Sequence, residues 1–342
     1  MNRQDSAPSA HFRPRLWWVG TIAGALLGVV LLVAVWAKAL DPAAFAEQIR
    51  IEKLDVVLSA PVLALLALAL EAGLGLALVL GIRRLWVLIP AALLVAFFIF
   101  LTGRAWWFAA HGLRDAAASC GCFGNLVQRT PAAAFWEDVL LLVPALLLAF
   151  VGREREGPIV PPLRTAVVAL GTVAVLVFAW KAPELPLDDL ATRLHPGVRV
   201  SDLCAGAGKQ SICLNTVAGG LAQGDHLVVI ASLAGVGGVG ANADPTLAAM
   251  VAALNEATRN PDGPKVWLLS SATPEQLTAF TWTMGPAFTV VEAPPELLRP
   301  LYRRLPRAFR VKDGRVTETY AGLPPVSRLA GLNTTTLVRS ST

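Results

Sequence analysis

Two cysteines stand one residue apart in this chain, within Cys120-Gly121-Cys122-Phe123-Gly124. The thiolate of a cysteine is the attacking group in thiol–disulfide exchange, and its access and pKa set the rate. A disulfide across one intervening residue closes a very small ring, which favours a labile and oxidising bond. Gly121 supplies the backbone freedom that such a turn needs. The spacing predicts a redox-active pair; a structural disulfide, or another thiol role such as metal binding, is the alternative.

A histidine precedes this pair and could assist it. His111 lies nine residues before Cys120 and could take a proton from a thiol. It also follows Trp106-Trp107-Phe108 at the end of an apolar segment, so an interfacial residue without chemistry is the alternative. Zinc needs four ligands, and His111 is the one obvious helper near the thiols, so we expect no metal site.

The remaining two of the four cysteines are Cys204 and Cys213. If Gly208 and Lys209 form a two-residue turn, these cysteines face each other as a non-hydrogen-bonded pair. Such a pair brings the Cα atoms to ~4.5 Å, at the short end of the disulfide range. We expect a structural disulfide here, and the alternative is a second redox pair that exchanges with the first.

Two ionisable residues fall within or beside apolar segments. Glu71 lies in the middle of one, where an ionisable group is costly and is a functional candidate by default. We favour a role in helix packing for Glu71. Lys38 lies near the end of another segment, and a rise of about 1.5 Å per residue predicts that the two are too far apart in depth to pair directly. Gly20, Gly24 and Gly28 form a stripe of small residues that predicts close helix packing.

The composition indicates a membrane protein. The 342 residues are 55% hydrophobic and 15% charged, with a mean hydropathy of +0.58, whereas a soluble protein carries about a quarter charged residues. The net charge of +5 comes with no basic stripe of interleaved aromatic residues, so we expect no nucleic-acid partner. The bilayer itself is the expected partner.

Five apolar segments approach the roughly 20 residues that a span needs. They are Leu16–Leu40, Leu58–Gly81, Leu85–Gly103, Phe135–Val151 and Leu163–Trp180. Most tryptophans lie near their ends, as in an interfacial belt, and the denser arginine flanks predict a cytoplasmic amino terminus. The first segment is longer than the apolar core of a cleaved signal peptide, so we expect an uncleaved anchor. This topology puts all four cysteines and the carboxyl-terminal region on the outer side of the inner membrane.

The expected organisation is a multidomain chain: an α-helical membrane bundle of four helices, a fifth tethering span, and a carboxyl-terminal α/β domain. The expected parts are a disordered cytoplasmic tail at 1–15, the bundle at 16–152, a connector with the fifth helix at 153–186, a periplasmic domain at 187–330 and a tail at 331–342. In the soluble part, hydrophobic patterns and turn signals predict two hairpins, one of 198–204 with 210–215 and one of 308–311 with 315–320. Between the hairpins they predict strands at 226–232, 265–271 and 288–292. They also predict helices at 245–258 and 295–305, and a helix that begins at 274.

The membrane half resembles the methylamine-utilisation MauE family, within the wider DoxX-like group of redox-associated membrane proteins. The resemblance covers about residues 16–152. It rests on Lys38 with Asp41-Pro42 and Phe45, on Glu71 followed by Gly73 and Gly75, and on Cys120-Gly-Cys122-Phe-Gly124. The family is linked to maturation of periplasmic methylamine dehydrogenase, whose small subunit is dense in disulfides, so the resemblance implies a role in methylamine metabolism.

The soluble half resembles the thioredoxin-like domain of membrane-tethered periplasmic thiol oxidoreductases. Leu305-Pro306-Arg307-Ala308-Phe309 is similar to that family's stretch around its cis-proline, which makes Pro306 the cis-proline candidate. The family places Cys-x-x-Cys after the strand at 226–232, but residues 233–244 contain no cysteine. The resemblance therefore implies a degenerate module that binds or docks partners.

The leading functional hypothesis is a thiol–disulfide oxidoreductase that uses Cys120 and Cys122 to form disulfides in exported client proteins. The sequence identifies no cofactor and leaves open a membrane quinone or a redox partner protein as the electron acceptor. One alternative is a non-catalytic assembly or tethering factor whose cysteines are all structural. A small-solute transporter using Glu71 is a further alternative, although paired halves and broken helices, which mark many transporters, are not evident.

Overall fold

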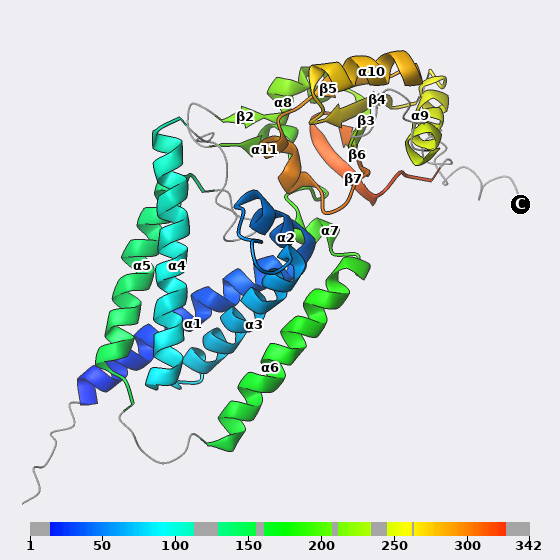
Figure 1. Ribbon diagram of the computed structural model, residues 1–342. Coiled ribbons are helices and arrows are strands. Elements are labelled where there is room, and N and C mark those ends of the chain that lie inside the picture. The colour runs from blue at the N-terminus through cyan, green and yellow to red at the C-terminus, as the bar shows by residue number, and fades with distance from the viewer. Residues whose placement is uncertain are drawn as a thin grey trace, which may run out of the picture.

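The computed structural model describes residues 14–112, 129–154, 161–206, 211–233, 245–261 and 263–325. It contains a bundle of long helices and, at one end of the bundle, a mixed α/β domain (Figure 1). The motif with Cys120 and Cys122, the turn at Gly208 and Lys209, and the expected tails lie outside the described residues, except that the first helix already begins at Pro14.

Among the described residues, five helices of the bundle are long and apolar enough to cross a membrane. They are α1 (Pro14–Leu40), α3 (Ala60–Val79), α4 (Leu85–Ala110), α5 (Pro131–Val151) and α6 (Pro162–Lys181). Each overlaps one of the five predicted spans, although α4 continues seven residues past its predicted end at Gly103 and α5 begins four residues before Phe135. This is therefore a multi-pass membrane protein in contact with lipid. In α6 only 6% of the apolar window is buried, against 28–44% in the other four, which makes α6 the most peripheral span.

Glycines allow α1 to approach its neighbours closely. A Cβ atom on Gly28 would lie 2.7 Å from the carbonyl oxygen of Gly75 in α3. A Cβ atom on Gly20 would lie 2.6 Å from the Cα atom of Gly152, just after α5. No side chain fits at such distances, so the predicted stripe of small residues is a packing surface, and α1 lies between α3 and α5.

A short helix that the sequence analysis did not anticipate, α2 (Pro42–Ile51), follows α1. Asp41 caps it by accepting a hydrogen bond from the Ala44 N–H at 3.0 Å, and Pro42 occupies its first turn. Ala46 and Ile49 are buried against the start of α3. This helix covers the end of the bundle that faces the α/β domain (Figure 1).

The carboxyl-terminal domain contains a five-stranded sheet in the order β5-β4-β3-β6-β7. Strands β3, β4 and β5 are parallel, whereas β6 and β7 are antiparallel to their neighbours. The strands are β3 (Asp225–Ile230), β4 (Lys265–Ser270), β5 (Thr289–Glu292), β6 (Arg307–Lys312) and β7 (Arg315–Ala321). Each strand begins within one residue of its predicted start, and each ends within one residue of its predicted end except β3, which ends two residues early at Ile230.

Both faces of the sheet are covered. Leu227 and Val229 of β3 pack against α9 (Pro245–Thr258) and α10 (Pro274–Met284). Val228 and Ile230 point to the other face. That face is covered by residues of 194–206 and 211–221, including α8 (Leu214–Val217), and by α11 (Pro295–Leu298). The alternation along β3 is what a central strand buried on both faces requires.

Two predicted elements are shorter than expected. The helix predicted at 295–305 ends at Leu298 and continues only as a 3₁₀ turn to Leu301, because Pro300 has no N–H to extend an α-helix. The hairpin predicted at 198–204 and 210–215 is reduced to β1 (Cys204–Ala205) and β2 (Ile212–Cys213). Residues 200–202 form a 3₁₀ turn instead, and the Val200 N–H bonds to the Gly314 carbonyl of the β6–β7 turn.

Candidate functional site

The ionisable pair inside the bundle is the first candidate site. Lys38 and Glu71 are 2% and 1% exposed, and the Lys38 Nζ atom lies 2.5 and 2.7 Å from the two Glu71 carboxylate oxygens. The prediction that they are too far apart to pair was therefore wrong. Both oxygens of Glu71 are satisfied by one ammonium group.

Side-chain tilt explains the error. The close approach of Gly28 and Gly75 sets an antiparallel register in which Lys38 lies opposite about position 65 of α3, some six residues or ~9 Å from Glu71 along the axis. Side chains on a helix lean toward its own amino terminus. Because α1 and α3 are antiparallel, the Lys38 and Glu71 side chains lean toward each other and close this gap.

Aromatic rings complete the environment of the ammonium group. The Lys38 Nζ atom lies 5.0 Å from the centre of the Phe45 ring in α2 and 5.1 Å from that of Phe98 in α4. These are cation–π distances. An ammonium group has three N–H donors, and Glu71 uses two of them. Around the ammonium group the other neighbours are aromatic and aliphatic side chains.

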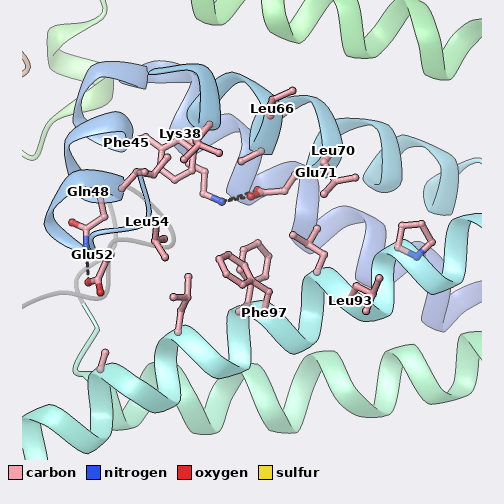
Figure 2. A pocket seen from close by; sticks show the side chains of 18 residues that line it. Lys38, Phe45, Gln48, Glu52, Leu54, Leu66, Leu70, Glu71, Leu93 and Phe97 are labelled. Carbon is pink, nitrogen blue, oxygen red and sulfur yellow. Dashed lines mark hydrogen bonds and ion pairs between the residues drawn. The ribbon is translucent and has the colours of Figure 1, made fainter. Parts of the chain in front are cut away.

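A cavity of about 560 Å³ opens beside this pair, between α2, α3 and α4. Figure 2 shows the Lys38–Glu71 bond at the middle of the cavity and Gln48 with Glu52 at one end. Gln48 Nε2 donates to Glu52 Oε1 at 3.2 Å, and Arg104 of α4 bonds to the same Glu52 carboxylate. The remaining lining is apolar: Phe45, Ile49, Leu54, Leu63, Leu66, Ala67, Leu70, Pro90, Leu93, Leu94, Phe97, Phe98, Leu101 and Ala105.

His111 lies at the carboxyl end of α4, at the last described turn before the segment with Cys120 and Cys122. Its ring is 4.3 Å from the Trp107 ring, and its Nδ1 atom is 2.8 Å from the Trp107 carbonyl oxygen. On the other side of the segment, Arg129 pairs with Glu137 of α5 at 2.7 Å. His111 thus contacts its own helix and Arg129 contacts α5, and the catalytic role of His111 stays a prediction.

Cys204 and Cys213 are joined by a disulfide, the pairing expected from the hairpin. They are directly opposite in the β1–β2 ladder, and the Leu214 N–H bonds to the Leu203 carbonyl beside them at 2.9 Å. Arg193 donates from Nη1 to the Cys204 carbonyl at 2.7 Å. The bridge therefore belongs to a packed part of the domain.

The peptide bond between Leu305 and Pro306 is cis, the conformation expected of Pro306. Arg307 follows it and pairs with Ile230 in the β3–β6 ladder, so Pro306 lies at the carboxyl end of β3. Arg307 is buried and its guanidinium lies 2.8 Å from Asp189. Arg303 donates to the carbonyls of Ala182 and Leu185, which follow α6. These contacts fasten the sheet to the last span.

One buried charged residue of the bundle was seen in the sequence only as a topology signal. Arg83, between α3 and α4, is fully buried. Its Nη1 atom donates to the carbonyls of Gly152 and Trp17, and its guanidinium lies 5.3 Å from the Trp17 ring. Gly24 leaves the space that its aliphatic stem occupies, with a would-be Cβ only 3.2 Å from Arg83 Cδ. Arg83 thus joins the α3–α4 turn to α1 and to the end of α5, at the end of the bundle opposite Lys38. Because Trp17, Gly24 and Gly152 are all far from Arg83 in the sequence, no local sequence signal predicts these contacts.

The comparisons with known proteins concern the membrane half. Residues 16–151 match the family described as methylamine utilisation protein MauE, so the bundle from α1 to α5 is a MauE family domain. No curated protein and no solved structure matches the chain.

Proposed function

Because residues 16–151 form a MauE family domain, we propose that the protein forms disulfides in client proteins outside the cytoplasm, with Cys120 and Cys122 as the exchanging thiols. In each cycle a client dithiol is oxidised to a disulfide and the Cys120–Cys122 disulfide is reduced to two thiols. Two electrons and two protons pass to the protein, and a membrane quinone or a redox partner protein would take them up and restore the disulfide. His111, at the edge of the segment, would take the proton from the attacking thiol.

The parity of the spans carries this proposal. Five spans put the segment between α4 and α5 on the same side of the bilayer as every residue after α6. The cysteine pair and the α/β domain then share one compartment. The Cys204–Cys213 disulfide in that domain favours an oxidising compartment, outside the inner membrane, with the amino terminus in the cytoplasm.

The α/β domain serves in this proposal as a thioredoxin-like module that docks clients. The support is the sheet order, the parallel β3 and β4, and a cis-proline next to the carboxyl end of the central strand. Residues 233–244 carry no cysteine at the position where the resemblance places the redox pair. Exchange would then occur in the membrane domain and recognition in the soluble one. The family description suggests a methylamine-utilisation enzyme as the client.

The alternative is a tethering factor in which all cysteines are structural. The observation that favours it is the Cys204–Cys213 bridge, which already shows one structural use of cysteine in this chain. The two functions differ in whether Cys120 and Cys122 change oxidation state.

Single Cys120→Ser and Cys122→Ser variants test the proposal. In each variant the remaining thiol can still attack a client disulfide and release one client thiol, which is the exchange reaction run in reverse. One of them should therefore hold a client as a mixed disulfide, visible as a band that a reductant removes, because the second thiol that would release the client is missing. The matched control, Ser119→Ala, alters the neighbouring residue and should trap nothing. A double Cys120→Ser, Cys122→Ser protein that is present at normal level and still supports full client maturation would leave only the tethering function.

A further inference from the structure

The cavity beside Lys38 and Glu71 has a composition that helix packing alone does not require. It is about 560 Å³, within the range of about 300–1,000 Å³ for small-molecule sites. One buried ion pair faces a lining of leucines and phenylalanines. We propose that this cavity binds a lipid-soluble quinone, meaning a neutral ring with carbonyl oxygens and an isoprenoid tail.

The charges select a neutral head group. Lys38 and Glu71 neutralise each other, since the ammonium group contacts both carboxylate oxygens. An anionic lipid phosphate brought to Lys38 would also approach the Glu71 carboxylate and would be repelled by it. The third N–H of Lys38 can still donate one hydrogen bond. A carbonyl oxygen accepts that bond without bringing a charge, and a hydrogen bond from a charged donor in a dry site is strong.

The aromatic residues select a flat ring. Phe45 and Phe98 flank the ammonium group at 5.0 and 5.1 Å, and Phe97 lies next along α4. Figure 2 shows Phe97 facing the Lys38–Glu71 bond across the cavity. Aromatic rings favour offset or edge-on contacts with another planar ring. A quinone ring placed under the ammonium group can therefore hydrogen-bond to Lys38 and contact phenylalanine at the same time.

The cavity opens toward lipid, which suits a tail and an entry path. Leu66 of α3 and Leu93 of α4 both line it and are 53% and 68% exposed in a region that the bilayer surrounds. Leu70, also in the lining, is 45% exposed. A ligand dissolved in the membrane can enter between these leucines without crossing water. An isoprenoid chain would lie along them, replacing contacts with lipid by contacts with protein.

The site includes no residue of the segment with Cys120 and Cys122. Binding of a quinone and exchange of disulfides are therefore separate properties, and either can fail without the other. The experiment below measures binding alone.

The test uses the full-length protein in lipid nanodiscs and two photoactivatable probes, an azido-benzoquinone with an isoprenoid tail and a phosphatidylcholine carrying the same azide on an acyl chain. The quinone probe should label peptides of α3 and α4, and an unlabelled quinone should compete for this labelling. The phosphatidylcholine probe should label the lipid-facing helices broadly, without competition.

Two variants locate the head group and the ring. The double variant Lys38→Met/Glu71→Leu removes the hydrogen-bond donor and leaves no unpaired buried charge. Its affinity for the quinone should fall about tenfold or more, because the quinone loses one hydrogen bond to a charged group. Ala67→Phe fills the cavity and keeps the ion pair, so it should abolish quinone labelling. Its control, Leu170→Phe, changes an exposed residue on α6 outside the cavity and should bind normally.

Should the double variant fail to reach the membrane, Ala67→Phe alone decides the matter. Equal labelling of the cavity by both probes, unaffected by Ala67→Phe and without competition by quinone, would mean that the cavity is a groove filled by ordinary lipid. Loss of labelling in the control would overturn the assignment of the site to α2, α3 and α4.

Discussion

The two regions of this protein hold ion pairs in different solvents. In the bundle, Lys38 and Glu71 are 2% and 1% exposed, and their contacts are with helices and phenylalanine rings. In the α/β domain, Arg310 and Asp225 pair across β3 and β6 while 30% and 32% exposed. Similar charges are thus dry in one region and partly wet in the other. A dry pair is costly to form and far more costly to break, whereas water solvates either member of the wet pair after its partner is removed.

The largest expected effect comes from breaking the dry pair. Lys38→Met should destabilise the bundle by about 3–5 kcal/mol, because it leaves the Glu71 carboxylate buried without a partner. Adding Glu71→Leu should recover most of the loss, since an apolar pair of similar size suits the same space. Denaturant unfolding in detergent micelles, with the bundle monitored by its helical signal, measures both variants. Equal stability of the single and double variants would mean that water reaches the site and that the two regions do not differ in this way.

A middle-sized effect should come from the packing that keeps this pair dry. Gly28→Ala puts a methyl group 2.7 Å from the Gly75 carbonyl oxygen, a backbone atom, so α1 and α3 must move apart. Overpacking of this kind costs about 1–3 kcal/mol. Gly73→Ala is the control, because its methyl group would meet only Thr172 Oγ1 at an ordinary 3.6 Å.

The same unfolding measurement compares the two glycine variants. Gly28→Ala should also weaken quinone labelling, as it shifts Lys38 relative to Glu71, whereas Gly73→Ala should leave labelling unchanged. If the two alanine variants are equally stable, the α1–α3 contact is looser than its geometry indicates, and the dryness of the pair has another cause.

Several parts of the fold could be predicted from local sequence. The spans are runs of apolar residues whose length alone identifies them. Strand β3 contains the apolar run Leu227–Ile230, and α10 begins with Thr273 and Pro274, which form its cap and first turn. The β6–β7 turn has Asp313 and Gly314 at φ angles of 48° and 73°, as the Asp-Gly sequence predicts. Each of these signals depends on residues close together in the chain.

The candidate site could be predicted only in part, because it depends on relations between distant segments. Lys38 and Glu71 were both identified as intramembrane polar residues, but their pairing follows from the α1–α3 register and from opposite side-chain tilts. The cavity requires the positions of three helices and has no signature in the sequence. In contrast, α2 was missed although Asp41-Pro42 is a helix start signal; its shortness after a long span concealed it.

The smallest expected effect is a pH dependence of the wet pair. The hydrogen bond from Arg310 is the main cause that lowers the pKa of Asp225 below its ordinary value of 3.8, and nearby positive charges add to it. A carboxyl group whose pKa is lower in the folded state contributes stability that is fully present above the unfolded pKa and is lost as pH falls through the folded pKa. The contribution should therefore be constant at neutral pH and disappear below about pH 4. Because the pair is about one-third exposed, we expect it to contribute less than about 1 kcal/mol to the stability of the domain.

Asp225→Asn should remove this acid-dependent contribution, whereas Asp202→Asn, at an exposed carboxylate away from Arg310, should keep it. The protein is unfolded in urea at each pH, and peptides from β3 and β6 are then labelled by hydrogen exchange at one fixed pH. This measures the stability of the α/β domain separately from that of the bundle. A loss of several kcal/mol in Asp225→Asn would place this pair with Lys38–Glu71 as a dry pair and remove the contrast between the two regions.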